Sequence, residues 1–309
     1  MAVALSKAPG LWLDDAMKSL YCALLAGVLV AWGTSPVASA AGAGKTGTGA
    51  SFKGPVGLQL YSLRDEFKKE VPGTMARVKD YGIQYVELAG TYGMPNDKFL
   101  QLLKDNGLKG VSGHFGYEKF RDDPEGAARD AKALGLKYIG CAWIPHQGAF
   151  DEKQCRATAA VFNRAGEACA KQGIRFFYHN HGYEFEKFGD GTLFDLLMTE
   201  TNPKYVAFQM DIFWTVFPAQ DPVKLLQKYG KRWELMHLKD MRKGLQLGSL
   251  SGGTDVRNDV TLGTGQIDLP AVLRAAKKAG VKYYFIEDES PDAATNIPNS
   301  LKFLESVKF

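Results

Sequence analysis

Short apolar runs alternate with amphipathic stretches along this chain from residue 56 to its end. The runs are rich in β-branched and aromatic residues, as strands are, and the stretches repeat apolar residues with helical spacing. Strands are predicted at 56–61, 83–88, 108–115, 136–143, 174–180, 205–211, 233–239 and 281–287. Helices are predicted at 71–81, 96–106, 124–134, 151–171, 192–200, 221–230, 268–279 and 295–307.

Several predicted helices end in a glycine that leads into the next strand, at Gly82, Gly107, Gly135, Gly173 and Gly280. A glycine fits the left-handed position that ends a helix. Eight strand–helix units predict a single α/β domain, a closed (β/α)8 TIM barrel. The alternative, a doubly wound open sheet, usually has a glycine-rich first turn, and residues 60–65 have none.

Four of the predicted strands end in polar, ionisable residues. They are His179-Asn180-His181 with Glu184, then Asp211, then His237-Leu238-Lys239-Asp240, and finally Glu287-Asp288-Glu289. Such groups are costly beside apolar residues unless they are paired or coordinated. Because the C-terminal strand ends form the active face of a barrel, the four patches are predicted to share one site. A divalent metal is the simplest occupant of that site.

Asp211, His237 and Glu287 are each separated by one strand–helix unit. Two carboxylates and an imidazole form a hard ligand set that suits Mn²⁺, Mg²⁺, Co²⁺ or Zn²⁺. One such ion is predicted, with Glu184 as its fourth ligand. The structural alternatives are a core histidine at position 237 and a helix N-cap at Asp211.

The histidines of the fifth strand and the lysine of the seventh are further candidates. His179 and His181 alternate, so an extended strand would turn them to opposite faces. Either one is a candidate for substrate contact or for an alternative metal ligand, and packing is the other role considered. Lys239 shares the face of His237 and is predicted to point at a substrate oxygen beside the metal, with a surface lysine as the alternative.

Polar residues at the remaining strand ends complete the candidate site. Glu87 and His114 are candidates for hydroxyl contacts or proton transfer, and structural hydrogen bonding is the alternative. The other candidates for substrate binding are Gln59, Tyr61, His179 and Trp143, the last beside His146. The long loop at 240–266 is rich in Gly, Ser and Thr and is predicted to be a lid or a substrate wall.

The first 54 residues do not follow the alternation. An apolar run at 20–33 follows Met17-Lys18 and precedes small residues at 37–40, which indicates a cleavable signal peptide. We therefore predict a signal peptide at residues 1–40 with its start at Met17, a flexible linker at 41–54, and a catalytic barrel at 55–309. Export to the periplasm is predicted, with a retained membrane anchor as the alternative.

Composition and charge narrow the function classes only slightly. The formal net charge of +4 and the ordinary composition indicate no nucleic-acid partner. Without residues 1–40 the cysteines are Cys141, Cys155 and Cys169. Their odd number and the lack of a CxxC pair argue against a disulfide framework or a zinc–thiolate site.

Several motifs together resemble the xylose isomerase-like barrel superfamily, broadly described as sugar phosphate isomerases/epimerases. They are GLQLYSLRD, YVELAG, SGHFGYE, YHNHGYEF, MDIFW, MHLKD, LGTGQIDLPAVL and FIEDE. The resemblance implies a divalent metal held by Glu184, Asp211, His237 and Glu287. Family epimerases usually place their first glutamate at the end of strand five, where this chain has His179. The YHNHGYEF motif is more similar to the branch with inosose dehydratases and exported enzymes acting on 3-keto sugars.

The implied chemistry is proton transfer next to a carbonyl. A metal chelated by a ketone and a neighbouring hydroxyl stabilises an enediolate, and a carboxylate or imidazole removes the α proton. The catalytic candidates are Glu184, Glu287, Lys239 and His181. The predicted function is a metal-dependent isomerase or epimerase acting on a keto sugar or polyol, with dehydration or hydration as a lyase variant.

Two alternatives from other classes remain. One is a non-catalytic exported sugar-binding barrel, and the other is a hydrolase with Glu184 and Glu287 as paired carboxylates. Export and the lack of a dense Arg/Lys cluster favour an unphosphorylated carbohydrate as the small-molecule partner. The sequence leaves open the product, the metal and whether the chain forms a homo-oligomer.

Overall fold

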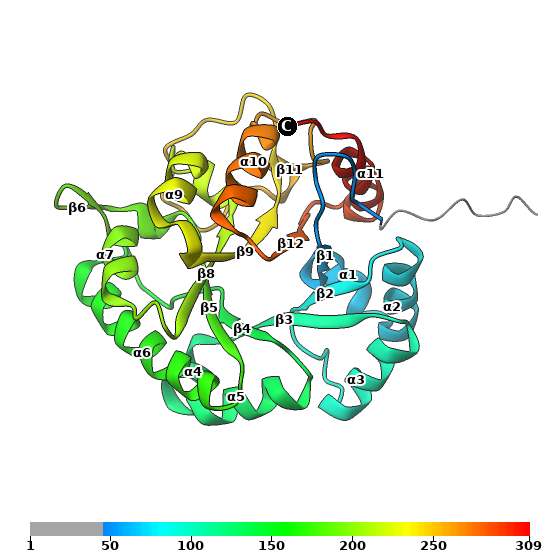
Figure 1. Cartoon of the computed structure of the whole chain (residues 1–309), viewed down its shortest axis with the longest axis horizontal. Coiled ribbons are helices and arrows are strands. Elements are labelled where there is room, and N and C mark those ends of the chain that lie inside the picture. Colours follow the sequence, from blue (N-terminus) through cyan, green and yellow to red (C-terminus); the bar gives the residue numbers. More distant parts are fainter. Residues whose placement is uncertain (1–45) are drawn as a thin grey trace, which may run out of the picture. The chain divides into compact units, whose positions relative to one another are not determined.

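Eight parallel strands close into a barrel in the order β1-β12-β9-β8-β5-β4-β3-β2 (Figure 1). The computed structural model describes residues 46–309, so the predicted signal peptide at 1–40 lies outside the described residues. The barrel strands are β1 (Val56–Gln59), β2 (Tyr85–Leu88), β3 (Lys109–Phe115), β4 (Tyr138–Cys141), β5 (Arg175–His179), β8 (Val206–Asp211), β9 (Trp233–Leu238) and β12 (Tyr283–Ile286). Because β1 pairs with both β2 and β12, the predicted (β/α)8 barrel is confirmed and the open sheet is excluded.

The predicted helices form the outer ring of the barrel (Figure 1). They are α2 (Val71–Asp80), α3 (Asn96–Asp105), α5 (Pro124–Ala133), α6 (Glu152–Lys171), α7 (Leu193–Glu200), α9 (Pro222–Tyr229), α10 (Leu269–Ala279) and α11 (Ala293–Ser306). Aspartates at positions 123, 221 and 268 accept hydrogen bonds from first-turn backbone N–H groups, and a proline follows each at the first or second position of the helix. Such N-caps fix where the helices begin. No helix within 46–309 is long and apolar enough to cross a bilayer.

The short elements that the periodicity missed lie mostly in the loops after the barrel strands. They are η1 (Leu60–Leu63), α1 (Arg64–Phe67), α4 (Tyr117–Asp122), η2 (Tyr183–Phe185), the hairpin β6 (Lys187–Phe188) with β7 (Gly191–Thr192), α8 (Ile212–Val216), β10 (Asp240–Met241) paired with β11 (Asp259–Val260), and η4 (Val256–Asn258). One more, η3 (Gly230–Arg232), precedes β9. Single turns and two-residue strands are too short to show a hydrophobic period.

The barrel interior is layered, and the layering positions the site. An apolar layer near the N-terminal end of the strands consists of Val111, Tyr138, Phe177, Ala207, Leu235 and Phe285. Successive side chains alternate between the two faces of a strand, so the residue two positions later also points inward. In four strands this next inward residue is polar: His179, Gln209, His237 and Glu287.

The described part of the predicted linker is packed rather than free. Phe52 is buried and makes an edge contact with Tyr284 of β12. The backbone N–H of Gly47 donates to Glu305 in α11, at 2.9 Å, and Ser51 Oγ accepts a hydrogen bond from the N–H of Phe309. Residues 46–54, predicted as part of a flexible linker, thus contact the barrel through one aromatic side chain and backbone hydrogen bonds.

Candidate metal and substrate site

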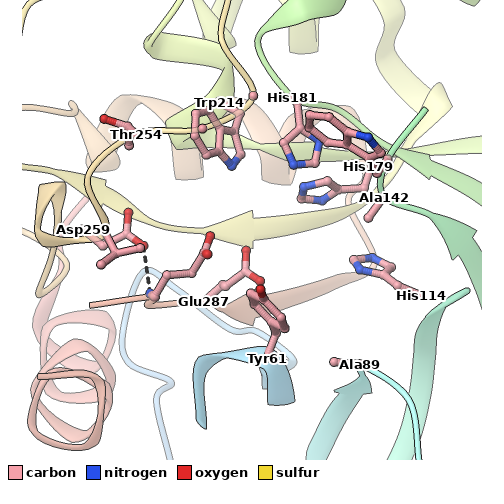
Figure 2. Close-up of a pocket in the computed structure, with 15 residues that line it drawn as sticks. Tyr61, Ala89, His114, Ala142, His179, His181, Trp214, Thr254, Asp259 and Glu287 are labelled. Atoms are coloured by element: carbon pink, nitrogen blue, oxygen red, sulfur yellow. Dashed lines mark hydrogen bonds between the residues drawn. The ribbon is translucent and has the colours of Figure 1, made fainter. Parts of the chain in front are cut away.

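A cavity of about 410 Å³ opens among the loops at the C-terminal ends of the strands (Figure 2). Figure 2 shows the imidazoles of His114, His179 and His181 on one side and the carboxylate of Glu287 across from them. Tyr61 and Trp143 also line the cavity and are about half exposed. The structure therefore brings six of the predicted site residues to one cavity: Tyr61, His114, Trp143, His179, His181 and Glu287.

Three of the predicted metal ligands converge beside this cavity. One atom each of Asp211, His237 and Glu287 lies within 4.8 Å of the others. His237 Nδ1 is 3.0 Å from Glu287 Oε2 and 3.7 Å from Asp211 Oδ2. All three side chains are buried or nearly so. Two carboxylates and one imidazole at these distances form a ready set of ligands for a divalent cation.

Asp211 combines a structural role with a free ligand atom. Its Oδ1 accepts a hydrogen bond from the N–H of Trp214, at 2.9 Å, and so caps α8. Its Oδ2 is buried and has no hydrogen-bond partner among the described residues. A buried carboxylate oxygen without a partner is costly. The predicted cap is thus present, and it occupies only one of the two oxygens.

Glu87 orients the ring of His237 through a hydrogen bond. His237 Nε2 donates to Glu87 Oε1, while Ser112 Oγ donates to Glu87 Oε2 at 2.6 Å. Burial alone would raise the pKa of Glu87, but His114, His237 and these hydrogen bonds lower it below its usual value. An ionised Glu87 therefore fixes the proton on Nε2 and leaves Nδ1 facing the carboxylates, an arrangement common for metal-binding histidines.

Gln209, which the sequence analysis did not single out, connects the polar residues of the barrel centre. Its amide Nε2 donates to both oxygens of Glu87, at 3.1 and 2.9 Å. Its Oε1 lies 3.0 Å from His179 Nδ1, so that nitrogen carries the proton. The lone pair of His179 is then on Nε2, which lies 3.9 Å from Asp211 Oδ2. Burial lowers the pKa of His179 well below its usual value, so this imidazole is neutral.

Lys239 is almost fully buried and faces an excess of negative charge. Its Nζ lies 2.7 Å from Glu289, 3.3 Å from Glu287, 3.5 Å from Asp259 and 4.0 Å from Asp211. Burial opposes the charge, but these carboxylates raise the pKa of Lys239 well above its usual value. The predicted surface lysine is therefore excluded. Burial raises the pKa of Asp259 to about 7, and the other three carboxylates still outnumber the one ammonium group, so the site favours a further cation.

Glu184 is the predicted ligand that the structure does not bring to this cluster. Both of its carboxylate oxygens accept the backbone N–H of His181, at 2.9 and 3.1 Å, and one accepts the hydroxyl of Tyr178. Tyr178 packs on Phe162 of α6, which places this contact outside the barrel wall. The single turn η2 directs the side chain there. His179 occupies the strand-five position of the site instead.

His181 is available at the wall of the cavity. Its Nδ1 is buried without a hydrogen-bond partner in the described chain. Burial lowers the pKa of His181 to about 3, so the ring is neutral and only weakly basic. Glu184 holds the backbone of His181 and so positions this ring from behind.

Two predicted substrate contacts lie beneath the cavity rather than on its surface. Gln59 and Glu87 have no exposed surface. Gln59 Nε2 donates to Glu87 Oε1, at 2.8 Å, so both residues support the site. Glu289, from one of the four predicted patches, also lines the cavity. Asp259 lines it too but was missed, because the two-residue pairing of β10 with β11 brings it in.

The loop at 240–266 contributes a wall of the cavity through Gly252, Gly253, Thr254 and Val256. Its two ends are tied together by pairing of β10 with β11. Asp240 accepts hydrogen bonds from the backbone N–H groups of Gly263 and Gly265, both at 2.9 Å. A Cβ at position 265 would lie 2.2 Å from the Asp240 carboxylate, which explains the glycine there.

The family model of the xylose isomerase-like TIM barrel matches residues 75–307. The chain belongs to this family.

Similar proteins include inosose dehydratases and sugar phosphate isomerases/epimerases. The inosose dehydratase of Geobacillus thermodenitrificans strain NG80-2 is 30% identical over 159 residues, which are 48% of this chain and 51% of that protein. The chain thus spans about half the length of the curated relatives it matches. A sugar phosphate isomerase/epimerase from Parabacteroides distasonis ATCC 8503 superimposes with a TM-score of 0.70 at 25% identity, over 87% of this chain and 96% of that chain. The IolI protein with a bound zinc atom shares the fold, with a TM-score of 0.65 at 16% identity, over 80% of this chain and 95% of that one.

Proposed function

We propose that this protein is a divalent-metal-dependent enzyme that moves a proton next to the carbonyl of a keto sugar or polyol. The reaction is an isomerisation, an epimerisation or a dehydration, and the inosose dehydratase relatives favour dehydration. The observation that carries the proposal is the convergence of Asp211, His237 and Glu287 beside the cavity, with Oδ2 of Asp211 unpaired.

The donor set fits a divalent metal. Asp211, His237 and Glu287 would hold the ion, with Nε2 of His179 as the fourth donor in place of Glu184. Two nitrogens and two carboxylates suit Zn²⁺, Co²⁺ or Mn²⁺ better than Ca²⁺. The solved neighbour with a bound zinc atom is consistent with this choice, although that likeness extends only to the fold.

Such an ion would polarise a substrate carbonyl and make the neighbouring C–H bond more acidic. The neutral imidazole of His181 lines the cavity and is the proposed acceptor of the proton. Lys239 stays protonated beside the cavity, where its charge compensates part of the carboxylate cluster. Glu87 and Gln209 keep the two ligand imidazoles oriented.

The lining of the cavity favours an uncharged substrate. None of the described residues that line it is a lysine or an arginine, and the nearby Lys239 is already engaged by carboxylates. Phosphate groups are usually bound by Arg, Lys or a helix N-terminus. We therefore propose an unphosphorylated keto sugar or polyol, unlike the substrate class named for the Parabacteroides structure.

Exchange of substrate protons with solvent tests the proposal directly. The full chain is stripped with a chelator, reloaded with Mn²⁺, Co²⁺ or Zn²⁺, and incubated with keto sugars and an inosose in D₂O. We expect deuterium incorporation next to the carbonyl only in the metal-loaded protein, detected by NMR, and none in His237→Ala or Glu287→Ala. A sugar-binding barrel gives binding without exchange, and a hydrolase keeps its activity in the chelator. Either result contradicts the proposal.

A further inference from the structure

A second cavity of about 400 Å³ adjoins the first one and shares three residues with it, Trp143, Gly252 and Gly253. We call the cavity beside the ligand cluster the inner cavity and this one the outer cavity. The rest of the outer cavity is formed by His146, Gly148, Ala149, Phe150, Tyr183, Glu186, Leu250 and Ser251. These residues come from the loops after β4, β5 and β9, so the outer cavity lies at the same end of the barrel.

Trp143 separates the two cavities and is held firmly although it is 45% exposed. The ring of His146 stacks on it, with centroids 5.4 Å apart and planes 24° apart. The rings of His181 and Tyr183 contact it edge-on, at 5.2 and 5.0 Å. A large, rigid aromatic surface left open between two cavities is typical of a ligand-binding position.

The loop at 240–266 meets Trp143 through a glycine. A Cβ at Gly252 would lie 2.5 Å from the indole ring, so no other residue fits there without movement. The partition between the cavities therefore consists of one indole and the backbone of two glycines. The partition contains no charged side chain, so nothing in it opposes an uncharged ligand that extends across both cavities.

The size and lining of the cavities indicate the class of ligand. Each is near 400 Å³, within the range that encloses a small organic ligand. Among the described residues, neither lining contains a lysine or an arginine. A single sugar ring in the inner cavity would leave the outer cavity and one side of the indole uncovered.

We infer that the substrate has two rings: a keto sugar in the inner cavity and a glycosidically linked second ring in the outer cavity, in contact with Trp143. The protein is then a glycoside-processing member of its family that acts on the sugar ring while the second ring supplies binding energy. This inference rests on the proposed function and adds the substrate class.

Ketoses with and without a second ring test the inference. The probes are D-fructose and the two-ring ketoses lactulose, isomaltulose, maltulose and turanose, titrated calorimetrically into the metal-loaded full chain. We expect at least one two-ring ketose to bind about tenfold more tightly than fructose. Trp143→Ala should abolish this preference and Trp143→Phe should keep part of it. Leu247→Ala, an exposed residue of the same loop that lines neither cavity, should not change it.

Two outcomes overturn the inference. One is that no two-ring ketose binds more tightly than fructose, and the other is a preference that persists in Trp143→Ala. The proton-exchange experiment separates this failure from that of the proposed function. Metal-dependent exchange without a two-ring preference contradicts only the second cavity's role, whereas two-ring binding without any exchange contradicts only the enzymatic activity.

Discussion

Buried ionisable residues lie at both ends of strand β9, but their charges are compensated to different degrees. At the N-terminal end, Glu234 accepts hydrogen bonds from Tyr138 at 3.0 Å, Arg175 at 3.0 Å and Lys282 at 2.7 Å. At the C-terminal end, His237 and Lys239 face several carboxylates, and one oxygen of Asp211 has no partner. We call the first end balanced, because two cations compensate its one carboxylate, and the second end unbalanced, because its carboxylates outnumber its cations.

The difference separates stability from function within one strand. In barrels of this kind the N-terminal face contributes stability and the C-terminal face holds the active site. A balanced cluster gains nothing from a cation, whereas the unbalanced one attracts it. The attraction is visible in the imidazole: burial opposes its charge, yet Glu287 and Glu87 raise the pKa of His237 well above its usual value.

Glu287→Ala should give the largest effect, at the unbalanced end. It removes one of the three converging ligands, so we expect loss of metal binding and a fall in kcat of at least about a thousandfold. Burial alone would raise the pKa of Glu287, but Lys239 and His237 hold it well below its usual value. The metal-free protein should therefore lose about 3–5 kcal/mol of unfolding free energy, because these buried cations lose a partner. Elemental analysis, kinetics and urea unfolding measure the three quantities, and an active, metal-loaded variant would exclude this site.

The strands, helices and most of the site were predictable because their determinants are local. Apolar runs of the strands and N-capping aspartates can be read directly, and strand ends in a barrel meet on one rim. Asp211, His237, Glu287 and Lys239 come together for that reason. Gln209 was also accessible: it is a polar residue in an apolar strand, two positions before Asp211 and therefore on the same face.

The remaining features depend on geometry that spacing does not encode. A single turn decides that Glu184 bends back to the N–H of His181 rather than into the cavity. Asp259 reaches Lys239 because β10 and β11 pair across a long loop. Phe52 anchors a segment whose composition predicts flexibility. Each depends on a contact between residues far apart in the chain or on the path of one short turn.

Glu184→Gln extends the comparison of the two strand ends to a buried carboxyl group that faces neither a cation nor the cavity. Burial raises the pKa of Glu184 from 4.5 to about 7, so the folded state favours the neutral form. This preference for the protonated carboxyl group contributes about 3 kcal/mol to the stability of the fold below about pH 4.5. The contribution is lost as the pH rises through about 7. Glutamine has no proton to lose. We therefore expect the stability of Glu184→Gln relative to wild type to rise by that amount between about pH 4 and pH 8.

Urea unfolding of both proteins across this range measures the difference, and Glu186→Gln, in the same loop, is the control. Other acidic groups titrate equally in wild type and variant and cancel in the comparison. A pH-independent difference would mean that the pKa of Glu184 is the same in the folded and unfolded states, and it would contradict the effect of burial.

Gln209→Ala tests how the unbalanced end is held in place. The substitution frees the ring of His179 and removes two hydrogen bonds from Glu87. Loss of such supporting contacts typically weakens metal affinity by about 10–100-fold. Competition with a chelating dye measures the affinity without reference to activity. Gln59→Ala is the matched control, because Gln59 also donates to Glu87 but does not contact His179, and its effect should be smaller.

Glu234→Ala changes the balanced end and should give the smallest effect. Glu234 is buried, but Lys282 is half exposed and Arg175 is partly exposed, so both can turn to solvent once the carboxylate is removed. The loss of unfolding free energy should therefore be about 1–2 kcal/mol rather than the 3–5 kcal/mol roughly expected for a fully buried pair. Metal affinity and kcat should stay at the wild-type level, because the apolar layer of Phe177, Leu235 and Phe285 separates Glu234 from the ligand cluster. A fall in metal affinity comparable with that of Gln209→Ala would show that the two ends of β9 are coupled through that layer.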